Sequence, residues 1–406
     1  MPLDLSQVAA QIEGLAAKLK SEEKERGERL ERALELLHAA DVASLKRKIA
    51  SSKTSWLVAG LVDGLAQHYE APLCPSAFTV LATDGSHIDV DRHSSVRCYL
   101  INIGSAVLHY GENPDAVLSS EPALFFGDDL VLTDHAGREE LIEGALLGVK
   151  RSVEECQALA KITQELPGER PTLALIDGSL ILWGLAGRDF EEAKSYVREE
   201  LLDREYLGAF DIMKRRVEGE KRCRENKILA LASYISFPRS ADVVNALRVA
   251  LCPHDTANCD RYCDRGRQRD CEGVAGIQDR DLFRTLLGYG ERSPIFISGS
   301  RFMQKHYGEH QIHFFYIKLD EEVARVEIPQ WVAEDEESVN LAHALVLDQC
   351  RRGHGYPVAL MEAHEKAVVT NADRENFWGL VELCLAEDRL NMRTSGKSRS
   401  KRTRWV

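Results

Sequence analysis

The chain has 406 residues, 44% of them hydrophobic, so it can bury a large core and is expected to fold as a globular protein of two or three lobes. Its formal net charge of −13 excludes a general affinity for nucleic acid, but it leaves room for a local basic groove. No stretch approaches the ~20 uninterrupted apolar residues of a membrane span, and the N-terminus lacks a basic and apolar signal region. We therefore expect a cytoplasmic protein with no membrane partner, whose ten cysteines are mostly reduced.

The sequence pattern predicts an N-terminal helical segment over residues 1–70. Residues 5–50 are rich in Ala, Leu, Glu, Lys and Arg, and their apolar residues recur at helical spacing, which indicates one long helix or a helical pair. A scaffold or a dimer contact is a simpler role for such a segment than catalysis. The residues expected to contact a second subunit or another protein are Leu15, Leu19, Leu30 and Leu34.

Residues 71–390 predict an α/β domain, a mixed sheet flanked by helices with further helical segments inserted. Short apolar runs bounded by turn residues predict strands at 78–83, 87–90, 98–103, 106–110, 172–176, 294–298, 313–319 and 323–328. Apolar residues at helical spacing predict helices at 138–166, 190–232, 335–353 and 372–389. The tail, residues 391–406, interleaves Lys and Arg with Ser, Thr and Gly, so it is expected to be disordered and to add weak electrostatic affinity for DNA.

Two buried-looking strands run into the same tripeptide. The strand at 78–83 ends in Asp84-Gly85-Ser86, and the strand at 172–176 ends in Asp177-Gly178-Ser179. One copy alone is ordinary turn chemistry. The pair favours a metal site, because Asp84 and Asp177 would reach one Mg²⁺ or Mn²⁺ ion if the two strands are neighbours in a sheet.

Other candidate site residues lie between and after the two strands. The helix at 138–166 carries Glu154 and Glu155, and Glu155 is our choice for a third carboxylate, with Glu154 in reserve. Tyr356 precedes a short helix that begins near Pro357, and His364 lies two turns along it. His364 could complete a metal shell or act as a general acid–base, and Tyr356 could hydrogen-bond a phosphate or stack on a base.

Four cysteines lie within twenty residues, in an insert at about 250–275: Cys252, Cys259, Cys263 and Cys271. In a reduced protein, such a group indicates a thiolate metal site rather than disulfides. Zn²⁺ is the first expectation. A [4Fe–4S] cluster is the second, because the spacing differs from paired Cys-x-x-Cys zinc knuckles, and free thiols in a loop are the third.

Taken in order, several segments resemble the NurA family of DNA repair nucleases over roughly residues 75 to 380. They are the two Asp-Gly-Ser strands, the strand at 314–319, Arg325-Val326-Glu327-Ile328-Pro329, and Tyr356-Pro357 with Ala363-His364. The resemblance implies an RNase H-like core, comparable to Argonaute PIWI domains. It also implies a homodimer around a DNA channel.

The same resemblance implies an activity and a site. The activity is a Mn²⁺- or Mg²⁺-dependent nuclease that digests DNA 5′ to 3′, cuts single strands, and works with the HerA hexameric ATPase in double-strand break resection. The family's residues fall on Asp84, Glu155 and Asp177 as acidic metal ligands and on Tyr356 and His364. Two cations in such a site would support in-line phosphodiester hydrolysis.

Two other function classes remain open at this stage: a non-catalytic DNA-binding subunit that regulates a translocase, and a phosphohydrolase for small substrates. The chain lacks a Gly-x-x-x-x-Gly-Lys-Ser/Thr loop, so it is not expected to hydrolyse ATP. The densest basic stretch inside the folded region is expected to form either a solvated helix face or a path for DNA phosphates. Its residues are Lys214, Arg215, Arg216, Lys221 and Arg222.

Overall fold

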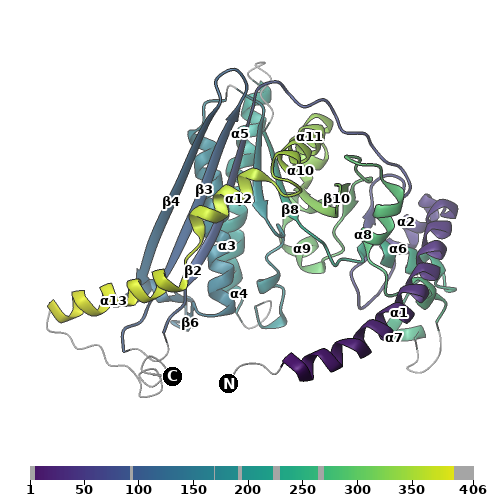
Figure 1. Cartoon of the computed structure of the whole chain (residues 1–406), viewed down its shortest axis with the longest axis horizontal. Coiled ribbons are helices and arrows are strands. Elements are labelled where there is room, and N and C mark those ends of the chain that lie inside the picture. The colour runs from purple at the N-terminus through teal and green to yellow at the C-terminus, as the bar shows by residue number, and fades with distance from the viewer. Residues whose placement is uncertain are drawn as a thin grey trace. The chain divides into compact units, whose positions relative to one another are not determined.

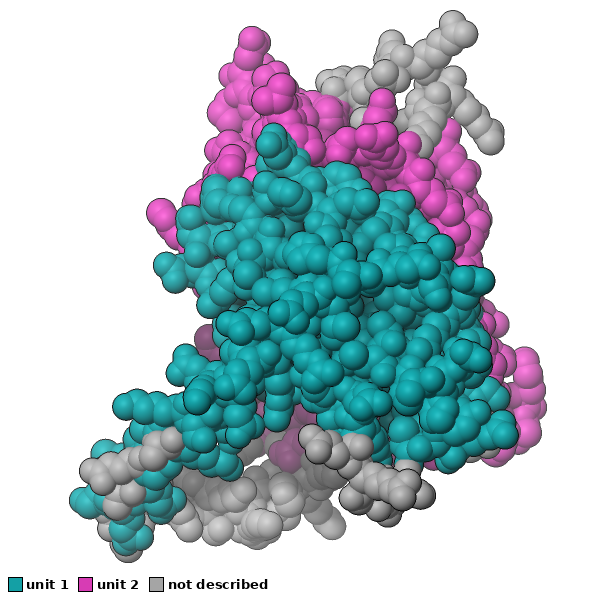
Figure 2. All heavy atoms as spheres, turned by 90° about the vertical axis from the view of Figure 1, so that its right-hand side faces the viewer, with its two compact units in different colours: residues 1–71, 235–304, 311–327 teal, residues 72–234, 305–310, 328–406 magenta. Residues whose placement is uncertain are grey.

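The computed structural model describes residues 5–91, 95–168, 170–190, 194–222, 229–263 and 269–387. The chain forms two compact units, coloured separately in Figure 2. Unit 1 comprises residues 1–71, 235–304 and 311–327, and unit 2 comprises residues 72–234, 305–310 and 328–406. None of the helices described in these ranges combines the length and the apolar character needed to cross a membrane. The basic tail lies outside the described residues.

The sheet of unit 2 has the strand order β4-β3-β2-β7-β8. Three strands form an antiparallel set in which β3 (Cys98–Tyr110) pairs with both β2 (Phe78–Ile88) and β4 (Asp115–Phe126). On the other side of β2, β7 (Thr172–Asp177) and β8 (Leu229–Ile235) run parallel to it and to each other. Three antiparallel strands extended by two parallel ones form the RNase H arrangement. The predicted RNase H-like mixed sheet is therefore confirmed.

Two predicted strand ends are wrong. Asp84-Gly85-Ser86 lies inside β2, paired with Gly104, Ile103 and Asn102 of β3, and the separate strands expected on either side of these glycines are continuous. The two glycines allow helices to approach closely. A Cβ atom at Gly104 would lie 2.2 Å from the carbonyl oxygen of Ala363, and one at Gly85 would lie 2.6 Å from Glu155 Oε1.

Five more strands differ from the prediction. β8 falls at the end of the stretch at 190–232 that was expected to be helical, and β6 (Glu139–Leu141) occupies the start of the helix expected at 138–166. The strands β1 (Gly60–Leu61), β4 and β5 (Val131–Thr133) were not predicted. All but the last residue of β8 are buried. A short buried strand shows no polar alternation, so its sequence cannot be told from a buried helix by periodicity.

Two helices cover opposite faces of the sheet of unit 2. Successive residues of a strand point to opposite faces. Gly85 faces Glu155 of α3 (Ala145–Glu165), whereas the hydroxyl of Ser86 donates to the carbonyl of Ala367 in α12 (Val358–Ala367). Figure 1 shows α12 crossing the strands β2 and β3. The side-chain amide of Asn102 holds the end of α12, donating to the Lys366 and Ala367 carbonyls at 3.0 and 2.9 Å.

Unit 2 contains further helices and a further strand. They are α5 (Leu207–Arg222), α10 (Gln330–Ala333), α11 (Glu336–Arg352), α13 (Asn371–Glu387), α4 (Ser195–Arg198), the π-helical segment Glu199–Tyr206 and β5 (Val131–Thr133). Gln349 of α11 caps α12, since its Oε1 accepts the Ala359 N–H at 3.0 Å and its Nε2 donates to the Tyr110 hydroxyl at 3.0 Å. This contact compensates for Pro357, whose side chain makes no cap at the start of α12.

Unit 1 packs helices around a small set of strands in the order β1-β9-β10-β11. The strands are β1 (Gly60–Leu61), β9 (Phe296–Ile297), β10 (Ile312–Lys318) and β11 (Val323–Pro329). The helices are α1 (Leu5–Ala39), α2 (Val42–Ala50), α6 (Asp242–Leu251), α7 (Cys259–Tyr262) and α8 (Asp279–Leu286), and α9 (Arg301–His306) follows β9. The N-terminal helical pair is thus confirmed.

The N-terminal helix serves its own unit along part of its length. Leu30 and Leu34 pack against the hydrophobic core of unit 1, so assigning them to a subunit contact was wrong. They lie on the half of α1 that faces α6 and α8. Leu15 and Leu19, about three to four turns before Leu30 toward the N-terminus, are each 53% exposed.

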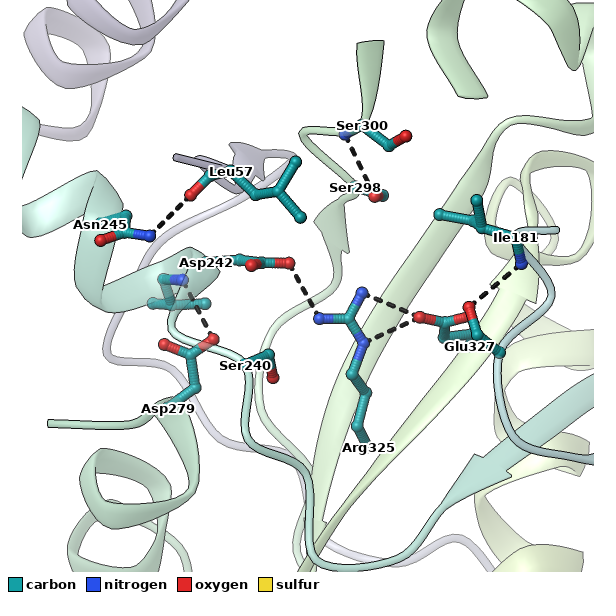
Figure 3. A network of polar contacts seen from close by, with 12 residues as sticks. Leu57, Ile181, Ser240, Asp242, Asn245, Asp279, Ser298, Ser300, Arg325 and Glu327 are labelled. Carbon is teal, nitrogen blue, oxygen red and sulfur yellow. Dashed lines mark hydrogen bonds and ion pairs between the residues drawn. The ribbon is translucent and has the colours of Figure 1, made fainter. Parts of the chain in front are cut away.

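The Arg325-Val326-Glu327 segment builds a buried ion-pair network inside unit 1 (Figure 3). Arg325 Nη1 lies 3.0 Å from Asp242 Oδ2, and Nη2 lies 2.9 Å from Glu327 Oε1. All three side chains are buried, so removing one partner would leave an uncompensated charge at a cost of about 3–5 kcal/mol. This part of the family resemblance therefore has a structural role.

Candidate metal and catalytic centre

Asp84 and Asp177 occupy equivalent positions on neighbouring parallel strands. The ladder between β2 and β7 ends with the pair Thr83 and Ile176, and each aspartate is the next residue on its strand. β7 stops at Asp177 because Gly178 has a φ of +84°, a conformation that favours glycine. The two strands are therefore neighbours, which is the condition for a shared metal site, and this brings both carboxylates to one end of the ladder.

Glu155 reaches the same place from α3. Its side chain is buried, and burial raises its pKa to about 8 against the opposing effect of the Arg151 guanidinium, with further upward contributions from Asp84 and Asp177. Arg151 Nε lies 3.0 Å from Glu155 Oε1, but the two atoms are not aligned for a hydrogen bond, and Oε1 has no hydrogen-bond partner. Glu154 instead points to Lys150, at 2.9 Å. Of the two adjacent acids, Glu155 is the one that joins the aspartates.

Gly85 leaves the space that Glu155 occupies. A Cβ atom there would lie 2.6 Å from Glu155 Oε1 and 2.9 Å from Arg151 Cγ, so Gly85→Ala is expected to displace the carboxylate. If the centre binds metal, a displaced ligand should lower the rate of metal-dependent cleavage by about 10- to 100-fold, the usual cost of a misplaced supporting group. Cleavage assays with thermal unfolding would measure this. Gly148→Ala is the matched control, since nothing lies within 4 Å of a Cβ there; equal effects of the two changes would contradict the prediction.

His364 and Tyr356 each contact one of the two aspartates. His364 Nδ1 lies 2.6 Å from Asp84 Oδ2, and the imidazole is 63% exposed. The Tyr356 hydroxyl donates to Asp177, and burial together with Asp177 raises the pKa of Tyr356. Asp177 stands at the exposed end of β7, yet its carboxylate is partly desolvated, which raises its pKa, while the Tyr356 hydrogen bond opposes the rise. Each aspartate is therefore held by a partner.

A tight loop sets the position of Tyr356. His354 and Gly355 have φ values of +53° and +110°, and a Cβ atom at Gly353 would lie 1.9 Å from the carbonyl oxygen of Tyr356. The ring of Tyr234 on β8 packs edge-on against that of Tyr356 at 5.4 Å, and its hydroxyl donates to the Gly355 carbonyl at 3.3 Å. β8 thus supports the loop as well as the sheet.

The structure brings Asp84, Glu155, Asp177, Tyr356 and His364 into one group in unit 2. The sequence interpretation missed three supporting residues: Arg151, Tyr234 and Gln349. Arg151 precedes Glu155 by four residues, so the helical i,i+4 spacing of opposite charges could have identified it. No comparable local signal marks Tyr234 or Gln349, because both act across the fold.

A second group in unit 2 could also hold an ion, judged by distance. The ligand atoms of Asp211, Glu309 and His310 all lie within 4.8 Å of one another. However, Trp331 Nε1 donates to His310 Nδ1 at 3.2 Å, which places the imidazole proton on Nε2, where it faces Asp211 Oδ1 at 2.9 Å. Lys214 also pairs with Glu309. These contacts already satisfy the group, whereas Glu155 Oε1 in the first group has the Arg151 guanidinium nearby at 3.0 Å but no aligned hydrogen bond.

The basic stretch on α5 has mostly structural partners. Lys214 forms the ion pair with Glu309, and the Arg216 guanidinium donates to the carbonyls of Thr163 and Leu166 at the end of α3. These two cations therefore have partners within the chain, and a role of the stretch in binding DNA phosphates stays a prediction. Arg215 is exposed, and the side chains of Lys221 and Arg222 lie outside the described residues.

An RNase H-like sheet that brings Asp84 and Asp177 on neighbouring parallel strands together with Glu155 of α3 is typical of nucleases. The chain belongs to the NurA family, because the NurA domain matches residues 78–369, a range that contains all five site residues. Among solved structures, the chain is similar to LC9-RNase H1, a type 1 RNase H with the type 2 active-site motif. That similarity has 12% sequence identity and a TM-score of 0.21, and it covers 43% of this chain and 71% of the other. No curated protein shows a significant sequence match to the chain.

Proposed function

We propose that the protein is a Mn²⁺- or Mg²⁺-dependent deoxyribonuclease that digests DNA 5′ to 3′ and cuts single strands. The observation that carries the proposal is the carboxylate of Glu155, which is buried beside Asp84 and Asp177 with one oxygen lacking a hydrogen bond. Three carboxylates in one partly desolvated place repel each other, and a divalent cation would relieve that repulsion. Oxygen donors with one imidazole fit a hard ion of this kind.

The site residues divide into ligands and supports. Asp84, Glu155 and Asp177 would hold the cations, which when bound supply an activated water and neutralise charge on the phosphate oxygens. Asp84 orients the imidazole of His364 through Nδ1, which leaves Nε2 free to complete the metal shell or to exchange a proton. The Tyr356 hydroxyl donates its hydrogen bond to Asp177, so it positions that carboxylate rather than the phosphate.

The test is cleavage of labelled DNA by the purified full chain with Mn²⁺, Mg²⁺ or EDTA. Single- and double-stranded substrates labelled at either the 5′ or the 3′ end distinguish the direction of digestion, and circular single strands without ends test internal cutting. We expect metal-dependent cleavage of single strands, early release of the 5′ label, and no product in EDTA. Cleavage that persists in EDTA would overturn the metal assignment.

The same assay separates the two other function classes. Binding of DNA without cleavage under any metal would favour a regulatory DNA-binding subunit. Hydrolysis of a small phosphodiester such as bis-p-nitrophenyl phosphate, with no cleavage of DNA, would favour a small-molecule phosphohydrolase. The site is not a deep pocket that would admit only small phosphodiesters, because His364 and Asp177 are both exposed at the surface.

The proposal extends to the partners expected from the family: a second copy of the chain and a HerA-type hexameric ATPase, acting together in resection of double-strand breaks. The exposed Leu15 and Leu19 of α1 support an intermolecular contact. Light scattering of the purified chain and of Leu15→Glu/Leu19→Glu tests the dimer, and co-purification tests the ATPase. A monomeric parent chain that retains no ATPase would remove the partners and leave the nuclease proposal standing.

A further inference from the structure

The four clustered cysteines lie in unit 1, between the end of α6 and a short 3-10 helix. Cys252 directly follows α6, Cys259 begins α7, Cys263 directly follows α7, and Cys271 lies in the 3-10 helix Asp270–Val274. All four are free thiols of intermediate burial. No step of the proposed nuclease reaction uses this segment.

Two of these cysteines form a pair across one helical turn. Cys259 and Cys263 are four residues apart, the N–H of Cys263 donates to the carbonyl of Cys259 at 3.1 Å, and their thiols are hydrogen-bonded. Cys271 lies near enough to this pair to act on Cys259 electrostatically.

The other two cysteines are held at the end of α6. Arg248 lies one turn before Cys252, and its Nε donates to the Cys271 carbonyl at 3.3 Å. The guanidinium is itself fixed, because it donates to Asn245 Oδ1 at 3.0 Å and stacks on Trp56 with its central carbon 4.3 Å from the ring centroid. The backbone of Cys271 is thus fastened beside the helix end that carries Cys252.

Hydrogen-bond donors and two cationic side chains lie around the cysteine segment. The N–H of Ser55 donates to the sulfur of Cys259, a contact that stabilises a thiolate. Lys48 Nζ donates to the Cys252 carbonyl, so a lysine and an arginine flank the cysteine backbone. The Cys259 backbone is anchored by its N–H to the Lys53 carbonyl at 3.0 Å. Thiolate metal centres carry net negative charge and need such supporting contacts.

We propose that Cys252, Cys259, Cys263 and Cys271 together bind one thiophilic metal centre that fixes residues 252–263 and 269–271 to the end of α6. Four thiolates are the donor set of a structural Zn²⁺ site, and they also fit a [4Fe–4S] cluster. A divalent ion of the Mg²⁺ type would not compete, because it prefers oxygen donors. The centre does not depend on the nuclease proposal, and its role is to stabilise unit 1.

Elemental analysis of the full chain, purified without oxygen or chelator, is the first test. We expect about one zinc per chain, or about four iron and four sulfide with absorbance near ~400 nm. Titration with a mercurial reagent should release zinc from the unmodified protein, a readout that needs no variant. Stripping the metal should lower the melting temperature, because a ligand that binds only the folded state stabilises it. A chain that contains neither metal and does not bind added Zn²⁺ would overturn the proposal.

Variants locate the centre. Cys259→Ser and Cys263→Ser should each lose the metal or weaken its affinity by more than about 100-fold. Cys74→Ser and Cys384→Ser are matched controls, since both cysteines are exposed and distant in sequence from the group, and they should retain it. Asp84→Asn should also retain it. Loss of the metal in the controls, or its retention in both cluster variants, would place the metal elsewhere and refute the assignment.

Discussion

Asp84→Asn and Asp177→Asn are each expected to reduce metal-dependent DNA cleavage by more than about 100-fold while leaving the fold intact. Changing a residue that merely supports a metal ligand costs about 10- to 100-fold, so loss of a ligand itself should cost more. Asparagine keeps the size of the side chain. It removes one negative charge from the group that includes Glu155, so DNA binding should be retained or slightly strengthened. Cleavage of labelled single strands, with fluorescence anisotropy for binding, measures both effects.

Asp89→Asn provides the control for this experiment. Asp89 follows β2 and is exposed, and its carboxylate accepts the N–H groups of Val90 at 2.8 Å and Gly144 at 3.3 Å rather than joining the acidic group. It should cleave DNA at close to the parent rate. An Asp84 or Asp177 variant that cleaves as well as the Asp89 variant would show that the acids are structural. Such a result would also favour the regulatory-subunit alternative.

The two Asp-Gly-Ser motifs made the central strands of the sheet predictable, but glycines within the strands obscured where the strands end. Two apolar runs ending in the same tripeptide predicted that Asp84 and Asp177 stand on neighbouring strands, and the β2–β7 ladder has this geometry. The glycines at 85 and 104 suggested turns from their local propensity. In the fold they remain within strands, because α3 and α12 approach the backbone too closely for any Cβ atom. That requirement comes from distant segments, so no local pattern reveals it.

The candidate site was predictable where a motif lies on one strand or helix, and not where distant segments meet. Residue spacing alone left Glu154 and Glu155 unresolved. In the structure, Lys150 of α3 forms ion pairs with Glu154 and with Glu205. Gly85 of β2 leaves room for Glu155 on the face of α3 that packs on the sheet. The basic residues of α5 show the opposite case. Their density in sequence suggested a DNA path, yet Arg216 is used to cap the end of α3.

Glu155→Gln is expected to abolish cleavage and, at the same time, to stabilise the metal-free protein at alkaline pH. The carboxyl of Glu155 has a pKa of about 8 in the fold against an ordinary value of 4.5. Between these two values the folded chain keeps a proton that the unfolded chain releases, so the free energy of unfolding falls as the pH rises from 4.5 to about 8. The full shift corresponds to an upper limit of roughly 5 kcal/mol. Glutamine cannot ionise and escapes this loss.

Urea unfolding at pH 5 and pH 8, with and without Mn²⁺, separates the contributions of proton and metal. At pH 8 without metal, the Glu155→Gln chain should be more stable than the parent by up to a few kcal/mol, and at pH 5 the difference should be small. Added Mn²⁺ should stabilise the parent, more strongly at pH 8 than at pH 5 because metal must displace the proton, and it should have little effect on the variant. Glu154→Gln, which changes the adjacent acid paired with Lys150, should follow the parent in both pH dependence and cleavage. If Glu154→Gln were the inactive chain, or if Glu155→Gln showed the same pH dependence as the parent, the carboxylate that binds metal would not be Glu155. The expected pattern would mean that the fold gives up stability at Glu155 in order to keep a carboxylate ready for a cation.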